Sequence, residues 1–459
     1  MFYMEMILSK TFKEMIFWMA WIIIPFIMEI VPSIVGFFIL IKKKMSLKKE
    51  CFSGKLPEIT VIVPVYNSAQ TLESCIKSIY ESNYPTGLID VMLVNNMSSD
   101  NSFEIFTKSQ KEFEGLSMRY LNAKQGKSKA LNMALFNSGG KYIIHIDSDG
   151  ILETNAIRNM VVRFEENPHI HCMTGAILTD AKYIENTKTP FLKLVRRCEF
   201  FEYAQAFLAG RNFESELNSI YTLSGAFSAF RKSTILKTQL YNSETVCEDT
   251  QITFQVRHLL KKKVYLCENA LFFVEPIDNF NKLYTQRQRW QRGEMEVSHM
   301  FLKDKIYSAG GFFSNFMIRI LMYDHTFAFP RMIWYFALIF LLFMDYPLYL
   351  VLGSVFVIYL LYVLSAFLFY LNVRVYLAEY KDIRKYYSAK VYLIVLMPLF
   401  NFMIFWIRFA GIINSIKLES KWKTLNLKEE YRAFCNVSKS DFQRVFKIID
   451  KVRRIVNNP

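Results

Sequence analysis

The sequence has few cysteines and histidines, and none of them falls into a disulfide or metal-binding pattern. Its seven cysteines form no CxxC pair and no cluster with the six histidines, so we expect neither a zinc site nor a disulfide framework. Six of the cysteines lie between Cys51 and Cys267, a usage typical of a reducing compartment. The sequence also lacks internal repeats and low-complexity segments, which excludes the repeat architectures.

The composition excludes both an ordinary soluble enzyme and a pure membrane bundle. Hydrophobic residues make up 52% of the chain, which is too many for the first class, and charged residues make up 21%, which is too many for the second. The formal net charge is +15. A protein with this excess of positive charge can bind nucleic acid, an anionic membrane surface or a phosphate-bearing substrate. Because the basic clusters flank the apolar segments, we expect membrane lipid as a partner and no nucleic acid.

An apolar run near the start of the chain predicts a first membrane span. It extends from Ile16 to Ile41, which is long enough to cross a bilayer, and we assign residues 1–44 to this unit. Glu29 lies inside the run, where a carboxylate costs about 2.5–3.5 kcal/mol, so we expect it to face protein or water. A lysine cluster follows, and it places residues 45–300 in the cytoplasm, because positive charge favours the inner side of a membrane.

Apolar segments return after residue 300. Residues 301–327 predict an interfacial amphipathic segment, and residues 328–413 contain three stretches of span length. These stretches are Ala328–Met344, Leu348–Tyr370 and Val391–Ile413. The tail, residues 414–459, is strongly basic, and three spans would place it outside, against the positive-inside tendency. The number of C-terminal spans therefore stays open; we expect a multi-pass protein of the plasma membrane and keep a membrane partner subunit among the candidate partners.

Residues 45–300 alternate between strand and helix patterns, which predicts an α/β domain. The predicted strands are 59–65, 91–94 and 142–146, and the predicted helices are 71–82, 102–113 and 127–136. This alternation favours a mostly parallel, doubly wound sheet. Ligands bind beyond the carboxyl ends of the strands in such sheets, so polar side chains at strand ends are the candidates for chemistry.

Asp147 and Asp149 directly follow the predicted strand 142–146. Two carboxylates at a strand end can hold a divalent cation such as magnesium or manganese, which prefers oxygen ligands and keeps phosphate oxygens in its shell. Such a metal helps a diphosphate to leave. The alternative is that Asp-Ser-Asp-Gly forms an ordinary turn, and on the local pattern both interpretations stay open.

Three further clusters each have a chemical and a structural interpretation. Lys127 either binds phosphate or is solvated. Glu248 and Asp249 either supply a general base to a sugar hydroxyl or cap a helix N-terminus. Arg289 suits phosphate and Trp290 suits stacking on a sugar face, whereas such a basic run also occurs at RNA or membrane interfaces. None of these clusters is decisive alone.

The order and spacing of the clusters give the chain a resemblance to the membrane-bound family 2 glycosyltransferases, the group that contains cellulose, hyaluronan and poly-N-acetylglucosamine synthases. The resemblance covers about residues 59–292 and looks closest to a branch of bacterial glycosyltransferases associated with exosortase systems. In family order, the matching residues are Val63-Pro64-Val65-Tyr66-Asn67, Gly126-Lys127, Ala130-Leu131-Asn132, Asp147 to Asp149, Ser224-Gly225-Ala226-Phe227, Glu248-Asp249, and Gln286, Arg289 and Trp290 of a QxxRW motif.

The resemblance implies a GT-A-type α/β (Rossmann-like) glycosyltransferase domain with N- and C-terminal transmembrane helices, and an inverting transfer. It implies metal binding by Asp147 and Asp149, and Asp249 as the catalytic base with Glu248 beside it. The implied donor-binding residues are Pro64, Tyr66, Asn67, Asn96, Lys127, Asp147 and Arg289. The implied acceptor-binding residues are Gly225, Ala226, Phe227, Gln286 and Trp290.

One stretch departs from the pattern of this family. The family usually carries an acidic residue in an (N/D)DGS stretch that contacts uracil, and here Asn96 and Met97 replace the Asp and the Gly. An amide can still accept a hydrogen bond from a ring N–H and can also donate one. A UDP-linked sugar therefore stays the expected donor, although the base is less firmly specified.

The predicted function is transfer of a sugar from a nucleotide-sugar donor to a growing cell-surface or extracellular glycan. The QxxRW motif favours processive synthesis with export through the helices. Two alternatives stay open: a transferase that adds one sugar to a lipid-linked acceptor, and a non-catalytic membrane scaffold that kept the fold. Product length separates the first from a polymerase, and hydrolysis of a nucleotide-sugar excludes the second.

Overall fold

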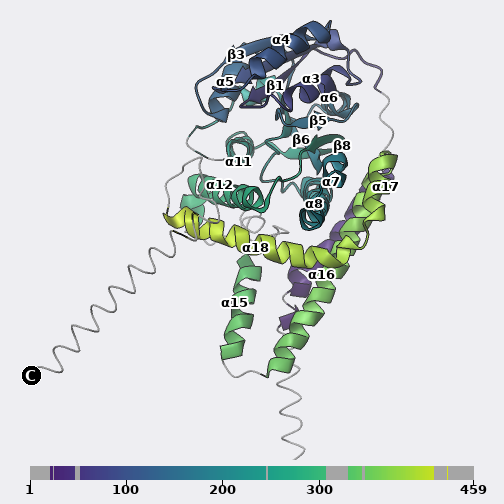
Figure 1. The fold of residues 1–459 in the computed structure, drawn as a ribbon, viewed down its shortest axis with the longest axis vertical. Coiled ribbons are helices and arrows are strands. Elements are labelled where there is room, and N and C mark those ends of the chain that lie inside the picture. The colour runs from purple at the N-terminus through teal and green to yellow at the C-terminus, as the bar shows by residue number, and fades with distance from the viewer. Residues whose placement is uncertain are drawn as a thin grey trace, which may run out of the picture.

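A computed structural model of the chain describes residues 21–23, 25–46, 52–243, 245, 247–306, 329–343, 347–417, 429 and 432. The predicted interfacial segment 301–327 and the basic tail 414–459 fall largely outside these residues, as does the start of the first predicted span. The described part consists of an α/β domain from which helices extend to one side (Figure 1).

Eight strands form one mixed sheet at the centre of this domain, in the order β3-β2-β1-β4-β7-β6-β8-β5. The strands are β1 (Ile59–Val65), β2 (Ile89–Asn95), β3 (Ser117–Asn122), β4 (Tyr142–Ile146), β5 (Gly150–Leu152), β6 (Cys172–Thr179), β7 (Phe227–Arg231) and β8 (Val264–Val274). The first four run parallel, but β7 is antiparallel to both β4 and β6, and β5 is antiparallel to β8. Because β6 and β8 are parallel to each other and both oppose the direction of β7, six of the eight strands run in one direction. The prediction of a mostly parallel sheet is therefore confirmed, with β7 and β5 as the two exceptions.

The strand and helix predictions for the first hundred residues of the domain are confirmed. β1 and β4 have the predicted bounds, and every residue of both strands is buried, as their apolar runs indicate. The predicted helices correspond to α3 (Leu72–Tyr80), α4 (Ser102–Glu112) and α5 (Lys127–Asn137). α3 buries the predicted apolar face against the sheet.

Except for the short η2 (Thr86–Leu88), which precedes β2, the remaining helices of the domain follow β5 in the sequence. They are α6 (Ala156–Glu166), α7 (Ala181–Glu185), α8 (Pro190–Tyr203), η3 (Ala204–Gly210), α9 (Arg211–Glu216), α10 (Lys232–Ile235), α11 (Glu248–Phe254), η4 (Gln255–Leu259) and α12 (Phe280–Ile306). Five cysteines of the described residues are buried and free.

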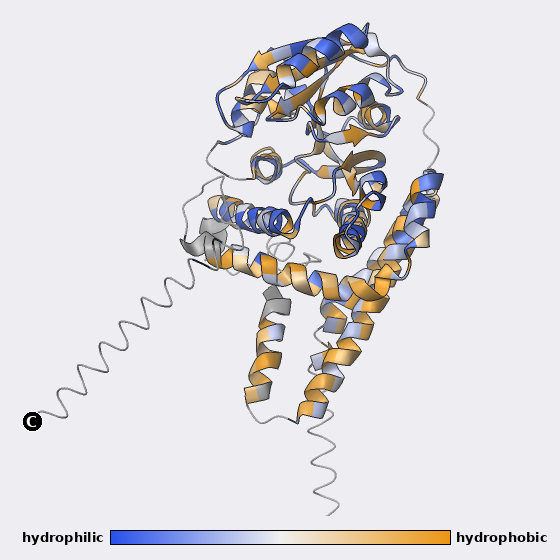
Figure 2. Ribbon diagram, viewed as in Figure 1, coloured by the Kyte–Doolittle hydropathy of each residue, from blue (hydrophilic) through white to orange (hydrophobic). Residues whose placement is uncertain are grey.

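The helices outside the domain are η1 (Phe26–Ile30), α2 (Val31–Ser46), α15 (Phe329–Phe343), α16 (Leu348–Tyr376), α17 (Lys381–Ala389) and α18 (Leu393–Lys417). Among them, α15, α16 and α18 are strongly apolar, whereas the short α17 is polar. Two segments, Leu348–Tyr376 and Leu393–Ile413, are long and apolar enough to cross a membrane. Figure 2 shows that α15 and α16 are hydrophobic along most of their length, whereas the outer face of the domain is largely hydrophilic.

α18 does not run in the direction of the other apolar helices. Figure 1 shows it lying crosswise to α15 and α16, below the domain, and it packs against α12. A buried arginine on α18, Arg408, donates to Gln291 Oε1 at 2.7 Å and lies 3.2 Å from a carboxylate oxygen of Glu294, both on α12. The predicted span Val391–Ile413 corresponds to α18, in which Leu393–Ile413 is long and apolar enough to cross a membrane, although this helix lies crosswise to α16 (Figure 1).

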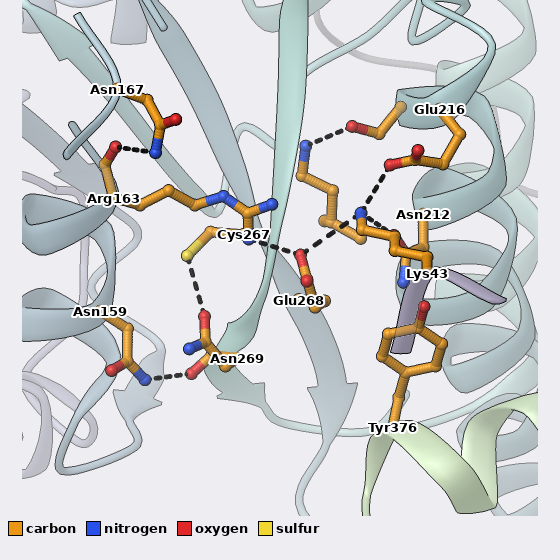
Figure 3. A network of polar contacts seen from close by, with 12 residues as sticks. Lys43, Asn159, Arg163, Asn167, Asn212, Glu216, Cys267, Glu268, Asn269 and Tyr376 are labelled. Carbon is orange, nitrogen blue, oxygen red and sulfur yellow. Dashed lines mark hydrogen bonds and ion pairs between the residues drawn. The ribbon is translucent and has the colours of Figure 1, made fainter. Parts of the chain in front are cut away.

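A network of polar contacts connects helix α2 to the α/β domain (Figure 3). Lys43, near the end of α2, lies 2.8 Å from Glu216 of α9 and 3.8 Å from Glu268 of β8. Glu268 also pairs with Arg163 of α6 at 2.6 Å. Apart from the exposed Glu216, these charges are largely buried. They compensate one another, which burial requires, and they fix the end of α2 against the sheet.

Glu29 faces the protein, as predicted from its cost in a membrane. Its Oε1 accepts a hydrogen bond from the hydroxyl of Tyr362 on α16 at 2.9 Å. One turn further along the helix, the hydroxyl groups of Ser33 and Ser365 share a hydrogen bond of 2.6 Å. The two contacts hold η1 and α2 against α16, and both Glu29 and Ser33 line a cavity between these helices.

Candidate active site

Polar residues that follow β1, β2 and β4 meet at one edge of the sheet, as the sequence predicts. Ser68, just after β1, shares a 2.7 Å hydrogen bond with Ser148, between the two aspartates that follow β4. Asn67, which has a positive φ of 50°, accepts a hydrogen bond from the backbone of Ser99 at 2.8 Å. The parallel strands β2-β1-β4 therefore present these three loops to one site.

Lys127 joins two of the predicted motifs. Its Nζ lies 2.6 Å from Asp147 Oδ1 and 3.3 Å from Glu248 Oε1. Burial lowers the pKa of Lys127, but the charges of Asp147 and Glu248 more than offset this effect, and the net shift is upward. Lys127 is therefore a charged residue of the site, and the interpretation as a solvated surface lysine is excluded.

The two aspartates after β4 suit a divalent cation whose other ligands come from a substrate. Asp149 keeps access to solvent, yet desolvation and the neighbouring charge of Asp147 raise its pKa to about 6. A bound cation would relieve this repulsion. Within the described residues no three Asp, Glu, His or Cys side chains gather as a metal site, so phosphate oxygens and water would have to complete the shell, as is usual for Mg²⁺.

The carboxylate of Asp249 is held by the backbone of the stretch 224–226. Its Oδ2 accepts a hydrogen bond from the Gly225 N–H at 3.0 Å, and its Oδ1 accepts one from Thr250 at 2.7 Å. Burial and the charge of Glu248 raise the pKa of Asp249, while Lys127 opposes them. Asp249 lies in the first turn of α11, but its bond to Gly225 shows that it does more than cap that helix.

Backbone groups of Gly225 and Ala226 connect Asp249 to Asp147, the first of the two aspartates that follow β4. The backbone N–H of Asp147 donates to the Ala226 carbonyl at 3.1 Å, and Lys127 Nζ lies 3.4 Å from the Gly225 carbonyl. A Cβ at Gly225 would lie 2.9 Å from Asp249 Oδ2. Only glycine fits beside this carboxylate without displacing it.

The QxxRW motif lies on α12, next to the start of α11. The Cys247 thiol lies 3.7 Å from the Arg289 carbonyl, with the geometry of a hydrogen bond. Trp290 packs against Tyr203 and Phe207, with ring centroids 6.3 and 6.0 Å apart. The guanidinium of Arg287 covers its ring at 4.2 Å, so Trp290 is partly enclosed.

Arg287 and Gln286 have partners inside the protein. Arg287 is almost fully buried and pairs with Glu202 at 2.6 Å, with Glu199 further away at 3.9 Å. Gln286 Oε1 accepts a hydrogen bond from Arg287 at 2.7 Å. Part of the basic run therefore joins α12 to α8 and is structural.

Three of the predicted donor-binding residues, Asn96, Pro64 and Tyr66, differ in their surroundings. Asn96 is buried, and its Oδ1 accepts a hydrogen bond from the Gly126 N–H at 2.6 Å, so this oxygen positions the start of α5. Pro64 is buried within β1, whereas Tyr66 is 46% exposed.

The prediction that Phe227 contacts the acceptor does not fit its position. Its side chain is fully buried in the core, with its ring 5.5 Å from that of Phe272. Phe227 begins β7, and the alternation of side chains along a strand turns its ring into the sheet packing. Its neighbours Gly225 and Ala226 supply backbone to the site instead.

Sequence reasoning missed the contribution of α9. Arg211 begins this helix and is buried next to Phe207, with the guanidinium 4.6 Å from the ring centroid. It belongs to no motif, so only the long-range packing of η3 and α9 under the sheet brings it to the site. Burial lowers the pKa of Arg211, and the charges of Glu214 and Asp249 oppose this shift.

Comparisons with known proteins agree with this geometry. Residues 60–237 match the model of the family described as Glycosyl transferase family 2. This match includes the residues after β1 and β4, and it ends before Glu248, Asp249 and the QxxRW motif. The assignment of those later residues rests on their contacts.

Curated relatives are bacterial polysaccharide synthases. The chain is 26% identical over 269 residues to a poly-beta-1,6-N-acetyl-D-glucosamine synthase of Staphylococcus epidermidis, and 23% identical over 257 residues to one of Staphylococcus aureus. The matches cover 58% and 56% of this chain, and they span only 62% and 59% of the length of those relatives.

A solved structure shares the fold over most of the chain. A mannosyltransferase from Pyrobaculum calidifontis, in complex with GDP-Man and Mn²⁺, superposes with a TM-score of 0.55 at 14% identity. The likeness covers 87% of this chain and 98% of that one. It extends the shared GT-A-type fold to the helices beyond the α/β domain.

Proposed function

Since residues 60–237 match the Glycosyl transferase family 2 model, we propose that the chain is a glycosyltransferase that transfers a sugar, with inversion, from a UDP-linked donor to a growing glycan. The observation that carries the proposal is the position of Asp249. Its carboxylate is fixed by Gly225 and lies in one charged cluster with Lys127, Asp147 and Glu248. The proposed base, Asp249, thus lies beside Lys127 and Asp147, the residues that we propose to act at the donor diphosphate.

In this proposal each residue has one task. Asp249 takes the proton of the acceptor hydroxyl, and Glu248 holds Lys127 beside it. Lys127 and Arg289 face the diphosphate. Asp147 and Asp149 would hold Mg²⁺ or Mn²⁺, which when bound neutralises charge on the leaving diphosphate.

The acceptor end of the site is proposed on α12. Trp290 would stack on the acceptor sugar, because an aromatic face suits the apolar face of a sugar ring. The names of the staphylococcal relatives make N-acetylglucosamine the first sugar to test and a cell-surface glycan the first product, formed by processive elongation. A transferase that adds one sugar to a lipid-linked acceptor is the alternative.

We further propose that the protein is a multi-pass protein of the cell membrane with residues 45–300 in the cytoplasm. The supports are the apolar helix α16 and the lysines at the end of α2, which favour the cytoplasmic side. Cysteines introduced on the surface of the α/β domain should resist a membrane-impermeant thiol reagent in intact cells. Ready labelling would overturn this topology.

The function is tested by turnover of the purified full-length protein. UDP-N-acetylglucosamine, UDP-glucose and GDP-mannose are compared with Mn²⁺, with Mg²⁺ and with a chelator, and both released nucleotide and product length are recorded. We expect release with one UDP-sugar, loss of release with chelator, and long products. Products extended by one sugar would favour the alternative, and no release from any donor would contradict the proposal.

A further inference from the structure

Arg211 is a buried cation that lacks a counter-ion among the described residues. Its side chain is 7% exposed, and its Nη1 atom is buried without a hydrogen-bond partner. No described residue forms a hydrogen bond or an ion pair with its guanidinium. The guanidinium lies over the ring of Phe207, 4.6 Å from its centroid.

The other buried arginines of the described chain differ in this respect. Arg287, Arg292 and Arg408 are each within 3.2 Å of a glutamate oxygen. A guanidinium stays charged in a protein, and leaving such a charge buried without a partner costs several kcal/mol. An anion is therefore the partner that Arg211 lacks.

The surroundings of Arg211 place this anion beside the proposed base. Burial lowers the pKa of Arg211, and the charges of Glu214 and Asp249 act in the opposite direction. Both carboxylates are near, but neither forms an ion pair with it. The ring under the guanidinium, Phe207, also contacts Trp290 at 6.0 Å between centroids. Arg211 thus lies on the side of Asp249 where the acceptor is expected.

The same helical segment borders a cavity on the membrane side. Gly210, Phe213 and Glu214, which flank Arg211 in sequence, line a cavity of about 120 Å³. Apolar side chains from α2, α16 and α18 complete much of its wall; among them are Leu40, Phe369 and Phe402. Arg211 therefore begins a helix whose following residues border this cavity.

We propose that Arg211 binds a phosphate oxygen of a lipid-linked acceptor whose apolar chain extends toward this cavity. The idea rests on the proposed sugar transfer and takes as acceptor the lipid-linked one that was named above as the alternative to a growing glycan. A sugar hydroxyl of the acceptor gives its proton to Asp249, its oxygen forms the bond to C1 of the donor sugar, and the bond from C1 to the nucleoside diphosphate breaks. The acceptor phosphate takes no part in these steps, so Arg211 is a binding residue.

The donor diphosphate is the other source of the same oxyanion chemistry. Lys127 and Asp147 already mark its place at the edge formed by β1 and β4. Arg211 belongs instead to α9, next to the membrane-side cavity. The acceptor phosphate is therefore the source to which the position of Arg211 points, and the experiment separates the two.

The test compares two lipids that differ only in the phosphate. Binding of undecaprenyl phosphate and of undecaprenol to the full-length protein is measured in the same detergent, for wild type, Arg211→Gln and Arg211→Lys. Arg163→Gln is the matched control, because Arg163 is also a largely buried arginine but has Glu268 as its partner at 2.6 Å. Affinity for UDP is measured in parallel.

We expect the wild type and Arg163→Gln to bind the phosphate about 10- to 100-fold more tightly than the alcohol, the usual worth of a charged hydrogen bond. Arg211→Gln should lose this preference, and Arg211→Lys should keep part of it. If Arg211→Gln does not fold, a reduced preference in Arg211→Lys carries the test.

Three results would overturn the assignment. They are equal binding of the two lipids by the wild type, an unchanged preference in both Arg211 variants, and a loss of UDP affinity in Arg211→Gln without a change in lipid preference. A wild type that prefers the phosphate but hydrolyses no nucleotide-sugar would instead count against the proposed function alone.

Discussion

The Nζ atom of Lys127 lies 2.6 Å from Oδ1 of Asp147. The first residue belongs to the start of α5 and the second to the end of β4, and Glu248 joins them from α11 at 3.3 Å. One ammonium group therefore links the proposed metal-binding pair to the proposed base pair.

Replacing this lysine should weaken donor binding. Lys127→Met keeps most of the length but removes the charge that would face the diphosphate. We expect affinity for UDP to fall about 10- to 100-fold, the loss that accompanies a charged hydrogen bond. Calorimetry measures it, with Lys129→Met as control, because Lys129 is exposed on the same helix. Unchanged affinity in Lys127→Met would limit Lys127 to a structural role.

A methyl group at Gly225 should misplace the base. The added Cβ would lie 2.9 Å from Oδ2 and 3.4 Å from Cγ of Asp249, so the carboxylate must move. A shift of about 1 Å costs on the order of 100-fold in rate, and we expect Gly225→Ala to lose sugar transfer by about that factor. Gly139→Ala is the control, because nothing lies within 4 Å of a Cβ there. Equal activity of the two variants would show that Asp249 tolerates displacement.

Trp290→Ala should separate acceptor use from donor use. One face of the ring is covered by Arg287, so the proposed stacking uses the remaining surface. Stacking of this kind is worth about 0.5–1.5 kcal/mol beyond the buried area, and we expect elongation to fall more than acceptor-free hydrolysis of the donor. Product length and released nucleotide measure the two. An equal fall in both would assign Trp290 to the packing of α12.

Glu199 should make the stability of the protein depend on pH. Burial raises its pKa to about 7, although Arg287 opposes this shift. A raised carboxyl pKa means that the folded state holds the proton more tightly, so stability should fall as pH rises from about 4.5 to 7. This contribution is up to about 3 kcal/mol.

Glu199→Gln should flatten that pH dependence, because the amide does not titrate. The thermal midpoint of wild type and variant, compared at pH 5 and pH 7.5 in one detergent, measures the difference. We expect the midpoint of wild type to drop more between these values than that of the variant. Parallel curves would mean that Glu199 does not titrate in this range.

The parallel half of the sheet could be predicted from the sequence because its signals are local. β1 and β4 are continuous apolar runs whose residues are all buried, and the helices between them carry one apolar face. β3 was missed because it is a half-exposed edge strand with the polar sequence SMRYLN. The antiparallel insertion of β7 depends on pairing with two distant strands, and no local pattern encodes such an order.

The candidate site was predictable where residues follow strand ends and less so elsewhere. Asp147, Lys127 and Asp249 come together as their motifs suggest. Phe227 was misassigned because the motif does not reveal which side of β7 a side chain occupies. Arg211 was missed because its position depends on how α9 packs under the sheet. The role of Gly225 was likewise hidden, since it depends on an approach between segments distant in the chain.

The central claim is that Asp249 is the base of a sugar transfer. Asp249→Asn keeps the shape of the side chain and an oxygen for the Gly225 N–H, but it cannot take a proton. The decisive measurement is the transfer rate of this variant with saturating UDP-sugar, together with its UDP affinity and thermal midpoint. We predict a fall in rate of roughly 10²–10⁴-fold with affinity and midpoint nearly unchanged. Near-normal transfer would contradict the account, because asparagine caps a helix about as well as aspartate does.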